Sequence, residues 1–178
     1  MNVAADGVVI AIAVPLSNNT SFLKLELHGA GGRLVSDNFY WIPTTLAQLD
    51  WANSTYYYTP ATTYADMRDL AQLPNVALQG WAERDASGDI RVKLSNAGNS
   101  VAFFVRLRAV KDGGDEDIAP VLWDDNYVSV LPGESKRLLL KSAAIDRQAV
   151  KILVDGWNVS PQTLRVATSG KGAHPWPN

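Results

Sequence analysis

The chain has 178 residues, a formal net charge of −2, 47% hydrophobic residues, six tryptophans, six tyrosines and no cysteine. This composition is typical of a globular protein with its own core and excludes a disordered chain. The small negative charge argues against nucleic acid as a partner, and a chain without cysteine has no disulfide framework.

The apolar run at positions 7–14 is too short to cross a bilayer and lacks the basic region of a signal peptide, so we expect no membrane partner. It is better interpreted as a strand. Asn-X-Ser/Thr sequences match the N-glycosylation pattern, although a pattern this short also arises by chance; they begin at Asn18, Asn19, Asn53 and Asn158.

Residues 1–45 are predicted to form a meander of three strands, at positions 7–14, 21–28 and 33–41. In the second strand, leucines alternate with polar side chains, which is typical of a sheet with one wet face. Such a small sheet is stable only if its apolar face packs on something else. The meander is therefore expected to belong to a larger structure.

Residues 46–75 are interpreted as a connector, because aromatic and turn-forming residues follow one another there without a clear period. Thr62 or Thr63 is expected to cap a short helix over residues 65–73, of two or three turns, that ends at Pro74.

From residue 76 the chain alternates short strands with tight turns, as at Pro132-Gly133. In the central strand, alternate residues from Val101 to Leu107 are apolar, whereas the opposite face carries Arg106 and Arg108, which we expect to pair with acids of adjoining strands. Trp81 is expected in the core. About seven short strands at this spacing predict an all-β protein with an immunoglobulin-like antiparallel β-sandwich over residues 76–168. Residues 169–178 are expected to form a loose tail.

Several motifs, in the same order along the chain, resemble the C-terminal immunoglobulin-like domain of glycoside hydrolase family 2, in its exo-β-D-glucosaminidase (chitosan-degrading) branch, with the β-mannosidases next. They are NAGNSVAFFVRLR at 96–108, PVLWDDNY at 120–127 and LPGE at 131–134, with VSDNFYW at 35–41, LDW at 49–51, YYTP at 57–60 and VDGWN at 154–158.

The resemblance implies that residues 1–45 are the terminal strands of a preceding immunoglobulin-like sandwich, so that the chain begins partway through a domain. It also implies a secreted or extracytoplasmic parent enzyme, whose catalytic and other domains would be the partners of this chain. The whole enzyme would remove glucosamine units from the non-reducing ends of chitosan oligosaccharides with retention of configuration. That activity is not expected of this chain alone.

No catalytic residue, metal or cofactor is expected. Glycoside cleavage needs two carboxylates that flank one bond, and in this family they lie on a (β/α)8 barrel, which takes about 200 residues or more. The adjacent Asp124 and Asp125 would point to opposite faces of a strand, so they are better interpreted as a turn whose carboxylates bind backbone amides. His28 and His174 have no evident catalytic partner, and the acidic loop at 111–117 is interpreted as a solvated hairpin rather than a metal site.

Aromatic side chains that stack on sugar rings, with acids and amides around them, make a candidate ligand-binding set for chitosan oligosaccharides: Trp123, Asp124, Asp125, Asn126, Tyr127 and Trp157. The competing interpretation is packing in the core or against a neighbouring domain. Three functions remain open: a non-catalytic accessory region of the hydrolase, a free-standing carbohydrate-binding module, or a protein-interaction domain.

Overall fold

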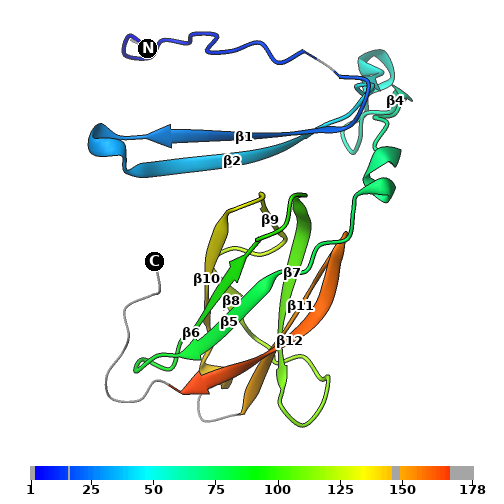
Figure 1. Cartoon of the computed structure of the whole chain (residues 1–178). Coiled ribbons are helices and arrows are strands. Elements are labelled where there is room, and N and C mark those ends of the chain that lie inside the picture. Colours follow the sequence, from blue (N-terminus) through cyan, green and yellow to red (C-terminus); the bar gives the residue numbers. More distant parts are fainter. Residues whose placement is uncertain (1–2, 16, 146–148, 169–178) are drawn as a thin grey trace. The chain divides into compact units, whose positions relative to one another are not determined.

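The computed structural model describes residues 3–15, 17–145 and 149–168 (Figure 1). The predicted tail at 169–178 lies outside the described residues. The chain divides into two compact units, Met1–Gln72 and Leu73–Asn178, and each is described by itself.

A two-stranded antiparallel hairpin dominates the first unit. Its strands are β1 (Ser21–His28) and β2 (Leu34–Ile42), joined by the 3-10 turn η1 (Ala30–Gly32). The prediction of a third strand at 7–14 is wrong: this run is irregular in Figure 1, and its Val8 side chain is 96% exposed. A strand needs a neighbour for its backbone N–H and C=O groups, and here the run remains unpaired in spite of its strand-like composition.

The rest of the first unit is a short hairpin and two 3-10 turns rather than the expected helix. Strands β3 (Gln48–Leu49) and β4 (Ala61–Thr63) pair, with η2 (Trp51–Asn53) between them. The predicted helix over 65–73 is replaced by the 3-10 helix η3 (Arg68–Gln72). Both predicted caps lie in β4, where the Thr62 hydroxyl donates to the Gln48 carbonyl and Thr63 pairs with Gln48.

Asp66 takes the place of the predicted threonine cap. Its carboxylate accepts hydrogen bonds from the backbone amide and the guanidinium of Arg68. These hydrogen bonds, the side-chain ones first, lower the pKa of Asp66 to about 2.

The second unit is the predicted immunoglobulin-like sandwich. One group of strands is ordered β8-β10-β6-β5 and the other β12-β11-β7-β9, and the parallel pairing of β12 with β5 joins them (Figure 1). This division matches the two sheets of an immunoglobulin-like domain. The strands are β5 (Gln79–Arg84), β6 (Ile90–Ser95), β7 (Ala102–Lys111), β8 (Leu122–Trp123), β9 (Val128–Val130), β10 (Ser135–Lys141), β11 (Val150–Gly156) and β12 (Val159–Thr168).

The core lies between these two groups of strands, where alternate residues of each strand are buried. Val92 of β6, Leu140 of β10 and Ile152 of β11 are all 0% exposed and belong to one cluster. The prediction that Trp81 lies in the core is wrong, because the register pairs Ala82 with the buried Val92 and so turns Trp81 outward, with 38% of its surface exposed.

The central strand β7 follows its predicted pattern from Val105 onward, whereas Ala102, which was expected on the outer face, belongs to the core. Val105 and Leu107 are buried, while Arg106 and Arg108 lie on the outer face. Arg106 pairs with Asp155 of the adjoining strand β11, as expected. Arg108 pairs instead with Asp117, in the loop that follows β7.

Candidate functional site

Trp123 and Asp124 belong to the edge of the β10 sheet. Trp123 lies opposite Leu140 in the ladder, and its half-buried side chain packs against the core. The amide of Asp124 donates to the carbonyl of Leu139, at 3.0 Å, and its Oδ1 accepts from the Leu139 amide, at 2.7 Å. Asp124 thus extends the ladder by one residue, and the sequence-based interpretation of this carboxylate as an amide ligand is confirmed.

Asp125 and Asn126 carry the chain from one sheet to the other. Asp125 Oδ1 accepts from the Asn126 amide, at 2.9 Å, and its Oδ2 lies 3.5 Å from Lys136 Nζ. The Asn126 side chain then binds the main chain of Leu107 twice, accepting from its amide and donating to its carbonyl, each at 2.9 Å. A side-chain amide therefore serves as the strand partner of β7 at this position.

The predicted sugar-binding set is consequently divided. Trp123 and Asp124 lie beside β10, whereas Tyr127 lies beside β7, at the start of β9. The structure instead brings Tyr127 next to Phe104, with ring centroids 5.0 Å apart and planes tilted by 46°. Tyr127 is 51% exposed and Phe104 is 36% exposed.

Trp157, the last residue of the predicted sugar-binding set, lies beside β7, as Tyr127 does. Its amide donates to the carbonyl of Phe103, at 3.0 Å, and its side chain is 58% exposed. Phe104, Tyr127 and Trp157 are called the aromatic row below. The sequence analysis did not include Phe104 among the candidate ligand-binding residues. Its place on the same strand face as Arg106, which is the less apolar face, indicated that its ring would be exposed.

A charged pair borders the aromatic row. Arg106 Nε and Nη2 donate to the two carboxylate oxygens of Asp155, at 2.9 and 2.6 Å. This bidentate contact raises the pKa of the Arg106 guanidinium, with a smaller contribution from the Tyr127 hydroxyl. The pair is only partly buried, with 41% of the Arg106 side chain and 33% of the Asp155 side chain accessible.

Asn158, next to Trp157, has a structural role. Its side chain is 7% exposed. Its Oδ1 accepts from the Phe103 amide, at 2.9 Å, and its Nδ2 donates to the carbonyls of Pro74 and Val101, at 2.7 and 2.9 Å. Because this amide nitrogen is buried and bonded, the glycosylation pattern at Asn158 has no acceptor available in the folded protein.

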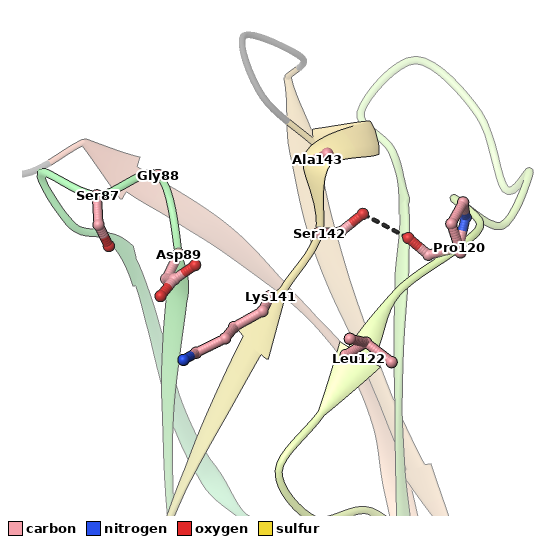
Figure 2. A pocket seen from close by; sticks show the side chains of 8 residues that line it. All are labelled: Ser87, Gly88, Asp89, Pro120, Leu122, Lys141, Ser142 and Ala143. Atoms are coloured by element: carbon pink, nitrogen blue, oxygen red, sulfur yellow. Dashed lines mark hydrogen bonds between the residues drawn. The ribbon is translucent and has the colours of Figure 1, made fainter.

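Among the described residues, cavities also open elsewhere on the sandwich, and two of them lie beside β6 and β10. The larger, of about 590 Å³, is shown in Figure 2, where the Lys141 side chain extends toward the side of Asp89 and the Ser142 hydroxyl donates to the Pro120 carbonyl. The smaller, of about 230 Å³, is lined in part by Asp124 and Arg137. The aromatic row contributes no residue to either cavity.

Within the described ranges, no group of three or more His, Cys, Asp or Glu side chains is placed to hold a metal ion. Three acids of the 111–117 loop pair with cations: Asp115 with Lys151, Glu116 with Lys111 and Asp117 with Arg108. The described residues also contain no helix that is long and apolar enough to span a membrane.

Comparison with known proteins identifies the family. The model of the "Exo-beta-D-glucosaminidase Ig-fold domain" matches residues 56–159, which is more than half of the chain. The chain belongs to this family. The exo-β-D-glucosaminidase of Arthroderma benhamiae is 36% identical over 83% of this chain and 17% of its own length, and that of Streptomyces avermitilis is 33% identical over 94% of this chain and 20% of its own length.

Solved structures agree with the sequence relatives. The crystal structure of the exo-chitosanase CsxA of Amycolatopsis orientalis superposes with a TM-score of 0.73 and 32% identity, over 87% of this chain and 19% of that chain. The chain therefore spans about a fifth of the length of the proteins that it matches. The resemblance drawn from the motifs is confirmed at the level of the family and of the fold.

Proposed function

We propose that this chain is a non-catalytic accessory region of an exo-β-D-glucosaminidase, which supports the catalytic barrel of the parent enzyme and shapes the access of chitosan oligosaccharides to it. The observation that carries the proposal is the extent of the match: the similarity covers nearly the whole chain but only 17–20% of the relatives. Chemistry supports it as well, because Asp124 is held by the backbone of Leu139 and cannot act with Asp125 on one glycosidic bond.

The parent enzyme is accordingly proposed to remove glucosamine from chitosan oligosaccharides outside the cytoplasm, where such a polymer is found. Its catalytic and other domains are the proposed partners of this chain. The test compares three proteins in the hydrolysis of chitosan oligosaccharides: this chain alone, the Amycolatopsis orientalis enzyme without its matching region, and that enzyme with this chain in place of the region.

We expect no hydrolysis by this chain alone, a loss of stability and a raised KM in the shortened enzyme, and partial recovery in the chimera. Hydrolysis by this chain alone would contradict the non-catalytic assignment. A shortened enzyme with unchanged KM, kcat and melting temperature would contradict the supporting role.

We further propose that residues 1–45 complete a sandwich whose other strands come from elsewhere in the parent enzyme. The supporting observation is the hairpin β1–β2, which exposes apolar side chains such as Leu27, at 61%, and Trp41, at 43%. A hairpin of two strands has marginal stability in water. Amides of β1 are therefore expected to exchange with deuterium rapidly in this chain and slowly in the parent enzyme, and equal protection in both would refute the proposal.

A further inference from the structure

We infer that the outer face of strands β7, β9 and β11 is a binding site for the pyranose ring of an oligosaccharide. The aromatic row contacts the C–H face of the sugar ring, and the Arg106–Asp155 pair binds the hydroxyl groups of the sugar. This site keeps Tyr127 and Trp157 of the set predicted from the sequence and leaves out Trp123, Asp124 and Asp125. Its binding does not need the catalytic domain of a parent enzyme.

The first argument is how the rings are presented. Phe104 and Tyr127 both have φ of +54°, a left-handed conformation that bulky residues rarely adopt. The pairing of β7 with β9 is irregular between Ala102 and Val105, which places Phe104 on an outward bulge. Strained residues of this kind persist only where the surrounding structure holds them, and they gather at binding sites.

The surroundings of Tyr127 show what holds it. The Asn126 side chain binds Leu107 of β7 and also accepts a hydrogen bond from the Tyr127 amide, at 2.9 Å. The tyrosine ring is thus fixed at its backbone while half of its surface stays open to solvent. A pre-ordered aromatic platform loses little conformational entropy when a ligand stacks on it.

The second argument is the polar group at the side of the row. Asp155 lies opposite Arg106 in the ladder and two residues before Trp157, so the ion pair borders the exposed rings. Two N–H groups of Arg106 are used on Asp155. Because a guanidinium has five N–H groups, donors remain even beside the Tyr127 hydroxyl, and each carboxylate oxygen keeps at least one lone pair. A sugar hydroxyl both donates and accepts, so it fits a pair that offers both functions.

The third argument is the size and charge of the surface, which favour a sugar over a protein partner. Two more ion pairs follow on this side of the sheet, Arg108–Asp117 at 2.8 Å and Lys151–Asp115 at 3.3 Å. Protein interfaces bury about 800 Å² on each partner and are depleted of charge at their centre. Here charged pairs lie beside three exposed rings, which suits a small ligand with both apolar and polar groups.

These three pairs balance three cations with three carboxylates, and Arg165 of β12, which lies opposite Lys151 in the ladder, adds a fourth cation. An amino group on the sugar therefore gains little from long-range attraction. The site is expected to recognise the ring and its hydroxyls rather than the ammonium of glucosamine. Binding should change little with salt, and oligomers of glucosamine and of glucose should bind with similar affinity.

The test is calorimetric titration of the 178-residue protein with glucosamine hexamer and with cellohexaose, at low and at high salt. Saturable binding of both is expected, with affinities that agree within a few-fold. Trp157→Ala and Tyr127→Asn should each weaken binding by about tenfold. Asparagine is chosen at 127 because it tolerates a positive φ, so the ring is lost without new backbone strain.

Trp81→Ala is the matched control, since Trp81 is also an exposed tryptophan but lies on β5. Circular dichroism and thermal unfolding establish that each variant is folded. No binding of either sugar to folded protein would overturn the inference and leave the row as a surface for another protein. Binding that survives both row variants but is lost in Lys141→Ala would move the site to the cavity of Figure 2 and overturn it too. If only the glucosamine hexamer bound, and high salt abolished its binding, recognition through the ring and its hydroxyls would be refuted.

Discussion

Asn158 is the most informative single position for testing how the sandwich is held together. Asn158→Ala removes three hydrogen bonds, to the Phe103 amide and to the carbonyls of Pro74 and Val101. Pro74 is exposed, so water replaces its lost partner, but Phe103 and Val101 are 2% and 8% exposed. Each buried group left without a partner costs about 1–3 kcal/mol. The expected loss of unfolding free energy is therefore about 3 kcal/mol.

The assay is urea unfolding followed by tryptophan fluorescence. Asn75→Ala is the control, because the Asn75 amide also donates one hydrogen bond, to Ser160 Oγ at 2.6 Å, but at an exposed position. That variant should lose no more than about 0.5 kcal/mol. A loss below about 1 kcal/mol for Asn158→Ala would refute the reasoning, because it would mean that water reaches Phe103 and Val101 in the folded state.

Three further predictions concern stability. Gly156→Ala should destabilise the protein by about 1–3 kcal/mol, since a Cβ there would lie 3.1 Å from the Phe103 carbonyl oxygen and 3.2 Å from Val105 Cα; unchanged urea unfolding would show that the backbone yields. Gly133→Ala should cost about 1–2 kcal/mol, because the φ of Gly133 is +78°; a smaller shift in the same assay would show that the turn changes type. At Asp85, burial raises the pKa, but hydrogen bonds from Ser87 and the charge of Arg91 outweigh it, and the pKa is lowered from 3.8. The stabilisation by ionised Asp85 is therefore present above pH 3.8 and is lost as the pH falls through the folded-state pKa. Unfolding midpoints measured over a pH series should fall less steeply toward acid pH in Asp85→Asn than in the original protein. An unchanged slope would contradict the lowered pKa of Asp85.

Local pattern predicted the second unit well because its strands pair with strands inside the same unit. The alternation gave the correct inner face of β7 from Val105 to Leu107, and the Pro132-Gly133 turn has the positive φ at glycine that such a turn requires. Before Val105 it was wrong, because the irregular pairing between Ala102 and Val105 places Ala102 in the core cluster instead of Val101 and Phe103. The first unit was predicted less well. Residues 7–14 have the composition of a strand, but composition cannot say whether a neighbour is present to pair with it.

Side-chain roles were harder to predict than strands. Trp81 was expected in the core because tryptophan is large and apolar, but register, which depends on distant β6, turned it outward. The Trp123–Tyr127 segment has the residue types of a sugar site in five consecutive positions. Its backbone crosses between sheets at Asp125 and Asn126, and no local pattern reveals such a crossing.

Several asparagine and aspartate side chains that the sequence suggests as ligand-binding groups bind the backbone of this chain instead. Asp124 pairs with Leu139, Asn126 with Leu107, and Asn158 with Phe103, in each case as a substitute for a main-chain partner at the end of a strand. Polar groups that satisfy the backbone in this way are not available to a sugar. The aromatic row differs, because its three rings are 36–58% exposed in this chain although Phe104 packs against Tyr127, and two of them lie at a positive φ. A surface that is held under strain and left open is the part of this fold that a ligand best explains.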